Sequence, residues 1–514
     1  MHTNAQQKQI LLLGIDIGTS GVKTAVFSPE QGLVASATEQ YTVDYPRPGW
    51  AQQDPQIWWH TLCTALQHLW VEGGVRPEEI AGIGVDGQSW SCIPVDRNGN
   101  VLHPTPIWID TRADTICRRE IARLGEERLF QISQNPFKPS YTTPKILWFK
   151  ENLPEVYKDT YKFLQSNSYI ILRLTSRFTQ DICQSYGLHI VNIASGEYDT
   201  QLADDLGIDL EKLVEKNSPC HQVVGLVTAQ AAQQTGLAVG TPVVAGGLDA
   251  ACGTLGAGVY QPGQTQEQGG QAGGMSICTP SWKGHPALIM SRHVVPDLWL
   301  LQGGTVAGGG ALNWIVSQIG SEERHLAAQL NRGAFEAVSD AAASVAPGSD
   351  GLVFLPYLLG ERSPIWDTHA KGVFFGLDFG KTRAHLYRAV MEGTAFALRH
   401  NLVVAATAGS SVDTLYAMGG AANSTVWTQL KADITGKPIL VPATDEATTL
   451  GAAILAGVGT GVYGSFREAV EQNSTILRRH TPDPALAAVY HRNYRLYREL
   501  YEKLKDTMAD FSAP

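Results

Sequence analysis

The stretch LLLGIDIGTSGVKTAVF, residues 11–27, decides the first part of the fold. Its alternating apolar residues predict two β-strands, Ile10 to Ile15 and Val22 to Phe27, joined by the turn Gly18-Thr19-Ser20-Gly21. A third strand is expected from Gly32 to Ala37. The chain therefore opens with a β-meander.

The segments after the meander predict a lobe that mixes sheet and helix. Asp54 and Pro55 are a favourable N-cap and first residue for a helix, and a strand from Ile80 to Val85 follows. A weaker echo of the opening comes after Gly263, where a short polar strand precedes the glycine turn 269–274 and an apolar run. We therefore expect two related halves, each beginning with a glycine hairpin.

Length and composition set the size and the class of protein. The chain has 514 residues, which is long enough for two to four domains. The second hairpin places the boundary near residue 245, so the predicted domains are 1–245 and 246–514. A hydrophobic content of 44% with 17% charged residues is ordinary for a folded globular protein.

The net charge and the cysteines exclude some classes of ligand and indicate a cellular compartment. The net charge of -10 disfavours nucleic acid and anionic membranes, although backbone dipoles can still bind an anion locally. The seven cysteines form no C-x-x-C pair, which argues against a disulfide framework and a zinc site. The N-terminal segment has no secretory signal, and no window contains the roughly 18 apolar residues of a membrane span. We expect a cytoplasmic protein with no nucleic-acid or membrane partner.

Asp16 is the first candidate functional residue. It lies between Ile15 and Ile17, where burying an unpaired carboxylate would cost several kcal/mol unless a cation or a set of donors compensates. The neighbouring turn 18–21 offers backbone amides and hydroxyls suited to phosphate, and Lys23 adds a positive charge. Phosphate with magnesium explains all of these features, and the alternative is a hydrogen-bonded turn aspartate.

Asp249 is the second candidate, because it is the only charged residue of the segment AGGLDAACGTLGAG, residues 245–258. If Val243-Val244 is a strand and a helix begins at Leu248, Asp249 lies near a helix N-terminus. Plain N-capping is one interpretation. The surrounding glycines and alanines leave room for a ligand, so a general base is the other.

Two further motifs suit a polyhydroxylated ligand. Gln88-Ser89-Trp90-Ser91 follows a predicted strand, and Trp108-Ile109-Asp110-Thr111-Arg112 contains an indole and a charge pair. Hydroxyl groups of a sugar need hydrogen bonds, while its C–H faces need an apolar surface. Structural turns remain the alternative for both motifs.

Taken together, these residues resemble the FGGY carbohydrate kinases of the actin-like ATPase superfamily, and most closely the xylulokinase group. The likeness runs nearly end to end. It is carried by LLLGIDIGTSGVKTAVF, PGWAQQDPQIWW, YTTPKILW, VVAGGLDAACGTLGAG, LPYLLGERSPIWDTHAKGVFFGL, MGGAANSTVWTQLKADITG and TLGAAILAG. The resemblance implies an α/β fold of two ribonuclease-H-like lobes, with ATP and sugar meeting in a central cleft.

The resemblance also assigns roles residue by residue. It implies that Asp249 is the catalytic base and that Asp16 organises Mg²⁺. The first phosphate hairpin corresponds to Gly18, Thr19, Ser20 and Lys23, and the second to Gly270 and Gln271. The turn beside adenine and ribose corresponds to Gly419, Gly420, Ala421 and Asn423, and the sugar-contacting segment to Gln88, Ser89 and Trp90. With the candidates Trp108, Asp110 and Arg112 from their own chemistry, and with Asp249, these complete the expected sugar site. Homodimers are common in the family.

Two departures from the group bear on function. Gly270-Gln271-Ala272 stands where xylulokinases usually have Gly-Thr-Ser, and Gln88-Ser89-Trp90-Ser91 stands where they have Gln-Met-His-Gly. The expected activity is ATP- and Mg²⁺-dependent phosphorylation of a terminal hydroxyl of a ketose, with D-xylulose preferred. The alternatives are another ketose or polyol of the ribulose, fuculose or erythritol type, a catalytically weak sugar sensor, and a chaperone-type ATPase.

Overall fold

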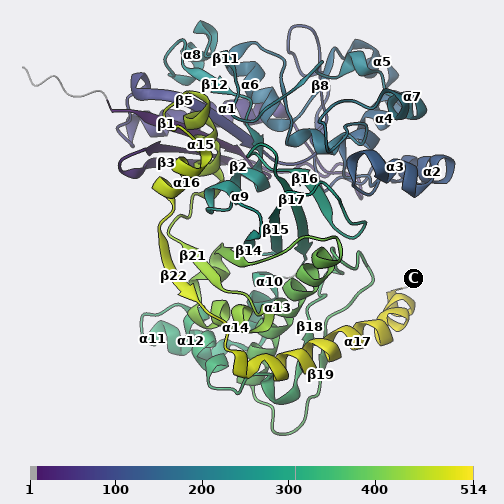
Figure 1. Cartoon of the computed structure of the whole chain (residues 1–514), viewed down its shortest axis with the longest axis vertical. Helices are drawn as coiled ribbons and strands as arrows, with labels where there is room; N and C mark the ends of the chain where they lie inside the picture. Colours follow the sequence, from purple (N-terminus) through teal and green to yellow (C-terminus); the bar gives the residue numbers. More distant parts are fainter. Residues whose placement is uncertain (1–8, 307, 513–514) are drawn as a thin grey trace, which may run out of the picture.

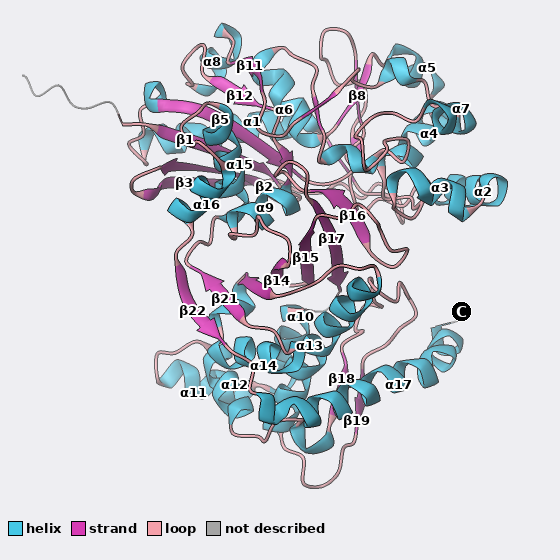
Figure 2. Cartoon of the chain, in the orientation of Figure 1, coloured by secondary structure: helices cyan, strands magenta, loops and turns pink. Residues whose placement is uncertain are grey.

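The computed structural model describes residues 9–306 and 308–512 and has two lobes, each built on a seven-stranded sheet (Figure 1). Helices flank both sheets, as the colouring in Figure 2 shows. Residues 1–8, 307 and 513–514 lie outside the described residues. They include the start of the predicted domain 1–245 and the end of the predicted domain 246–514.

The N-terminal sheet begins with the predicted meander. Its strands run in the order β11-β12-β5-β1-β2-β3, and β13 also pairs with β5. The meander strands pair antiparallel, whereas β5 is parallel to β1 and β12 is parallel to β5. The strands are β1 (Leu11–Ile17), β2 (Gly21–Ser28), β3 (Gly32–Gln40), β5 (Ile80–Gly87), β11 (Val223–Leu226), β12 (Pro242–Val244) and β13 (Gly247–Leu248).

The C-terminal sheet repeats this topology. Its order is β16-β17-β15-β14-β20-β21-β22, with the hairpin of β14 and β15 antiparallel and β14, β20 and β21 parallel. The strands are β14 (Gln264–Gly269), β15 (Gly273–Thr279), β16 (Ile289–Arg292), β17 (Trp299–Thr305), β20 (Thr414–Met418), β21 (Ile439–Pro442) and β22 (Ile476–His480). The predicted second hairpin and the two related halves are therefore confirmed.

The helices follow local sequence signals where those are strong. Asp54 caps α1 (Pro55–Val71) by accepting a hydrogen bond of 2.9 Å from the Gln56 amide, as predicted. The other N-terminal helices are α2 (Asp114–Leu124), α3 (Glu126–Ser133), α4 (Thr142–Asn152), α5 (Pro154–Asp159), α6 (Ser166–Thr175), α7 (Thr200–Leu206) and α8 (Ala229–Thr235). Short strands complete this region: β4 (Gln52–Gln53), β6 (Ile93–Val95), β7 (Thr105–Pro106), β8 (Lys162–Leu164), β9 (Gln180–Asp181) and β10 (Asn217–Ser218).

The second half of the chain contributes the remaining elements. They are α9 (Asp249–Gly256), α10 (Gly309–Ile319), α11 (Ser321–Gln329), α12 (Ala334–Ala343), β18 (Val353–Leu355), β19 (Val373–Phe375), α13 (Arg383–Thr407), α14 (Thr425–Thr435), α15 (Ala447–Gly459), α16 (Phe466–Asn473) and α17 (Ala487–Ser512). Among the described residues, no helix is both long and apolar enough to cross a membrane.

Helix α15 lies against the N-terminal sheet although it comes late in the chain (Figure 1). The approach is so close that a Cβ on Gly14 of β1 would lie 1.9 Å from the Thr449 carbonyl oxygen, and one on Gly84 of β5 would lie 1.9 Å from that of Ala452. Only glycine fits at these two positions. The lobes are thus interleaved in space, and a single boundary at 245/246 stays a prediction.

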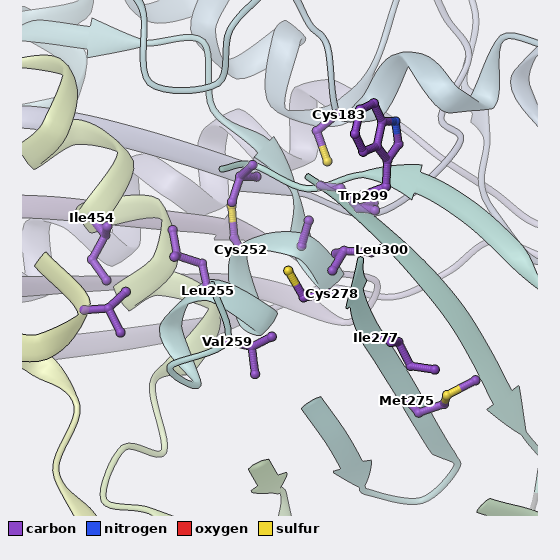
Figure 3. Packing of buried hydrophobic residues seen from close by; sticks show 14 of the residues in the cluster. Cys183, Cys252, Leu255, Val259, Met275, Ile277, Cys278, Trp299, Leu300 and Ile454 are labelled. Carbon is purple, nitrogen blue, oxygen red and sulfur yellow. The ribbon is translucent and has the colours of Figure 1, made fainter. Parts of the chain in front are cut away.

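One hydrophobic cluster runs beneath the region where the lobes meet. Figure 3 shows Cys252 and Leu255 of α9 and Ile454 of α15. They belong to the same cluster as Ile277 of β15 and Leu300 of β17 in the C-terminal sheet. All five side chains are almost fully buried. This shared core fixes α9, and with it Asp249, at the junction of the two lobes.

Candidate active site

A cavity of about 390 Å³ lies between the lobes and collects many of the predicted site residues. The first half of the chain contributes Asp16, Gly18, Ser89, Trp90, Trp108 and Tyr186 to the lining. The second half contributes Asp249, Gln268, Gly273, Gly274, Gln302 and Arg362, among others. Residues distant in sequence thus share one concave site whose lining mixes apolar and aromatic surface with a few polar groups, which is the arrangement expected for a small-molecule pocket.

Three parallel strands end side by side at this cavity. Asp16 of β1 pairs in register with Asp86 of β5, and Asp86 pairs with Gly247 of β13. Asp249 follows two residues after Gly247. The carboxylates of Asp16, Asp86 and Asp249 therefore lie together at the carboxyl ends of these strands. Sequence reasoning missed Asp86, although Gly84-Val85-Asp86 repeats the Gly14-Ile15-Asp16 pattern.

Asp249 is the first residue of α9, and the N-cap position belongs to Leu248. Burial foremost, and the nearby charge of Asp16, raise the pKa of Asp249 to about 7, while a 2.6 Å hydrogen bond from the Ala250 amide lowers it. A carboxylate with a pKa near neutrality is suited to accept a proton from an alcohol.

Asp16 has the features of a cation ligand. Burial raises its pKa to about 6, against the opposing effects of the neighbouring carboxyl of Asp86 and the charge of Lys23, while Glu446 adds to the rise. Its Oδ1 atom is buried and has no hydrogen-bond partner among the described residues. An orphaned carboxylate oxygen fits Mg²⁺, which takes one or two protein carboxylates and completes its shell with water and phosphate oxygens.

The first hairpin is held by the protein itself. The Gly18 amide donates to the Gly21 carbonyl at 3.0 Å. The Thr19 hydroxyl accepts from the Trp108 indole at 2.8 Å and donates to the Gln88 amide oxygen at 3.3 Å. Ser20 is exposed, so its hydroxyl is accessible to a ligand.

The turn of the second hairpin, between β14 and β15, is hydrogen-bonded to the N-terminus of α10. The carbonyls of Gly270 and Gln271 accept from the amides of Gly309 and Gly310 at 2.7 and 2.9 Å. These amides belong to the first turn of α10, whose unpaired donors are thereby satisfied. The Gln271 side chain itself is exposed.

A second cavity of about 300 Å³ contains part of the predicted nucleotide turn. Gly419 and Asn423 line it, together with Asp445 and Arg478. Gly420 is exposed beside it, whereas Ala421 is buried and faces a small cavity inside the C-terminal lobe.

The segment 444–448 connects the two cavities. Asp445 lines the second cavity and Thr448 lines the first, and between them Glu446 forms an ion pair of 3.0 Å with Lys23. An elongated ligand could therefore extend from the turn at Gly419 to the carboxylates at the strand ends.

Aromatic side chains form one wall of the first cavity. Trp90 stacks on Tyr141 with ring centroids 4.1 Å apart, and its buried indole nitrogen has no hydrogen-bond partner among the described residues. Ser89 accepts a hydrogen bond of 3.2 Å from Tyr186. Gln88 lies behind this wall, where its side chain donates to Gln53 at 2.8 Å.

The structure places Asp110 and Arg112 outside the lining of the cavity. Arg112 donates from Nε to both carboxylate oxygens of Asp110, at 3.0 and 2.9 Å, and both side chains are fully buried. Its guanidinium lies 4.0 Å from the ring of Trp50 and 4.9 Å from that of Trp148. Asp110 also accepts from the Ala51 amide at 2.7 Å and Arg112 donates to the Gln52 side chain at 3.0 Å, so the pair ties its loop to the segment before α1.

Arg362 is a cavity residue that the sequence reasoning did not single out. Its guanidinium reaches from the C-terminal half to within 5.9 Å of the Trp108 ring, so the residue spans the two lobes. Burial foremost lowers its pKa, against the charge of Glu361. The only sequence signal was the quoted segment LGERSPIW, which contains charge but does not show what it faces.

Duplicated α/β lobes with carboxylates at the strand ends beside the junction define the actin-like ATPase class of fold. Solved structures agree: a xylulose kinase from Rhodospirillum rubrum superposes with a TM-score of 0.88 at 31% identity over 97% of this chain and all of that one. A gluconate kinase from Lactobacillus acidophilus gives 0.89 at 25% identity over 98% of this chain and all of that one.

Sequence comparison identifies the family. Residues 11–256 match the N-terminal domain, and residues 285–460 the C-terminal domain, of the FGGY family of carbohydrate kinases. The xylulose kinase of Bacillus subtilis is 30% identical over 502 residues, 96% of this chain and 97% of that one. The chain belongs to the FGGY family and is a xylulokinase-like carbohydrate kinase, as the sequence predicted.

Proposed function

We propose that this kinase transfers the γ-phosphoryl group of ATP to a terminal hydroxyl of a ketose, with D-xylulose as the preferred substrate. The observation that carries the proposal is the position of Asp249. It lines the cavity between the lobes, near the strand-end carboxylate of Asp16, and shares that cavity with the aromatic residues Trp90, Trp108 and Tyr186.

In this proposal the sugar occupies the first cavity and the nucleotide base the second. The triphosphate extends along segment 444–448 toward the hairpin that follows Asp16. The Ser20 hydroxyl and the partly exposed turn of Gly270 and Gln271 lie at the ends of the two hairpins, where phosphate contacts are expected.

Asp249 accepts the proton of the sugar hydroxyl as its oxygen attacks the γ-phosphorus. A new sugar O–P bond forms, the bond from the γ-phosphorus to the β,γ-bridging oxygen breaks, and ADP leaves with that oxygen. Mg²⁺, held by Asp16 and phosphate oxygens, supplies charge neutralisation when bound. Little covalent chemistry is required of the protein beyond positioning and proton transfer.

The choice of D-xylulose is supported by relatives and depends on the wall around Trp90. Chains named xylulose kinase match nearly the full length of this one, whereas one structural neighbour is named a gluconate kinase. Ser89 and Trp90 line the cavity and differ from the Met-His of xylulokinases, so we expect them to affect the choice of sugar.

The direct test measures ADP release by the full chain with MgATP and a panel of D-xylulose, D-ribulose, L-xylulose, L-fuculose, erythritol and D-gluconate. We expect the highest kcat/KM with D-xylulose and phosphate on its terminal hydroxyl. A higher kcat/KM with another sugar would reassign the substrate, and no sugar-dependent ADP release would remove the proposal.

The variant Asp249→Asn separates catalysis from binding. It should lower kcat about 10²- to 10⁴-fold, the usual contribution of a positioned base, while the sugar still raises the melting temperature. Near-normal turnover would exclude Asp249 as the base. Sugar-dependent stabilisation of the unaltered chain without ADP release would instead favour a sensor, the alternative that Gln271 in the second hairpin motivates.

A further inference from the structure

We propose that Asp86 is a second carboxylate ligand of the divalent cation, acting together with Asp16. The proposal rests on the proposed function only in that the phosphates of ATP complete the coordination. Its first support is the register of the sheet, because Asp16 and Asp86 are direct neighbours on the parallel strands β1 and β5.

The two carboxylates also lie on the same face of that sheet. Side chains two residues apart in a strand point to the same side. Gly14 and Gly84, two residues before Asp16 and Asp86, both contact the backbone of α15. Both aspartates therefore project toward the side of α9 and α15, where Asp249 and Thr448 border the cavity.

The second support is the absence of donors around Asp86. Its side chain is 0% exposed, and apart from the adjacent carboxyl of Asp16 neither carboxylate oxygen has a hydrogen-bond partner among the described residues. The Oδ1 atom of Asp16 is in the same state. Burying a carboxyl pair without donors is costly, and either a shared proton or a cation removes the cost.

The charged groups on this face supply only part of the missing compensation. Lys23 lies opposite Asp16 in the antiparallel register, but its ammonium is already 3.0 Å from Glu446. Asp249 adds a further negative charge. A divalent cation is therefore the group that best balances this face, and two carboxylates with phosphate oxygens are a common ligand set for Mg²⁺.

The substitution Asp86→Asn distinguishes a cation from a shared proton. Asparagine has the shape of aspartic acid and can donate a hydrogen bond to Asp16, so it reproduces a protonated Asp86 but carries no charge for a metal. Mn²⁺ serves as the probe, and its free concentration is followed by electron paramagnetic resonance without sugar, in the absence and in the presence of ADP.

We expect the Asp86→Asn variant to bind Mn²⁺ at least tenfold more weakly than the unaltered chain in the presence of ADP. Mn²⁺ should also raise the melting temperature of the unaltered chain more than that of the variant, since only the former keeps both ligands. Neither readout needs turnover, so the result stands apart from the outcome of the sugar panel.

Asp181→Asn is the matched control. Asp181 is equally buried but its oxygens accept from the Gln184 amide at 2.7 Å and from Asn167 at 2.9 Å, so the substitution should leave Mn²⁺ affinity unchanged. Asp86→Ala provides a second variant if the amide disturbs folding. Unchanged Mn²⁺ affinity in a folded Asp86 variant, or an equal loss in Asp181→Asn, would overturn the proposal.

Discussion

The Lys23 ammonium lies 3.0 Å from a carboxylate oxygen of Glu446, the residue that precedes the first turn of α15. The pair joins the first hairpin of the N-terminal sheet to a segment from the other end of the chain. It also places one cation beside the carboxylates at the end of β1, on the path between the two cavities.

Replacing Lys23 with methionine should weaken ADP binding about 10- to 100-fold, the loss expected for a charge-assisted hydrogen bond to phosphate. Stability should change by no more than about 1 kcal/mol, because the ion pair with Glu446 is partly exposed. Calorimetric titration with ADP provides the measurement. Lys505→Met, which breaks a surface ion pair of 2.7 Å with Glu502 on α17, is the control and should leave ADP affinity unchanged.

The raised pKa of Asp249 predicts the acid limb of the rate profile. The base works when ionised, so kcat/KM should fall about tenfold per pH unit below a value near 7. Steady-state rates with subsaturating sugar from pH 5 to 9 would show this limb. A profile that stays flat down to pH 5 would contradict the assignment.

The same shift has a consequence for stability. Asp249 has a folded pKa of about 7 against an ordinary value of 3.8, so the folded chain binds this proton more tightly than the unfolded chain. Its contribution to stability therefore decreases as pH rises from about 4 to 7. Asp249→Asn should flatten this part of the dependence of melting temperature on pH.

The sequence was most informative where its signals are local. Alternating apolar residues and glycine turns predicted both hairpins, and Asp54-Pro55 predicted the start of α1. The strand ending at Val85 was read two residues short, which left Asp86 out of the site. The repeated pattern of glycine, a β-branched residue and aspartate was the signal that could have identified it.

Contacts between segments that are far apart in the sequence could not be predicted from local patterns. The packing of α15 on β1 and β5 depends on Gly14 and Gly84, and the need for glycine at these positions cannot be recognised before the helix is placed. In the same way, the sequence showed Asp110 and Arg112 as a charge pair in a turn. Whether that pair faced the cavity or the interior was decided by Trp50 and Trp148, which enclose Arg112 from other segments.

This enclosure predicts a structural effect for Arg112→Leu. Removing one member of a buried ion pair leaves Asp110 uncompensated and should cost about 3–5 kcal/mol, seen as a lower melting temperature. The KM for the sugar should stay within about twofold in the protein that remains folded, because neither residue lines the cavity. A large rise in KM at unchanged melting temperature would instead make the pair part of the sugar site.

The indole nitrogen of Trp90 should contribute to sugar binding, because it is buried at the cavity wall without a protein acceptor. Trp90→Phe keeps an aromatic ring against Tyr141 but removes the N–H donor. We expect the KM for the sugar to rise about three- to tenfold, the effect of one lost hydrogen bond, with the KM for ATP unchanged. Trp58→Phe is the matched control, since the Trp58 indole nitrogen is also unpartnered but lies in the core of the N-terminal lobe. Equal effects of the two substitutions would show that packing, and not a contact with the sugar, explains the change.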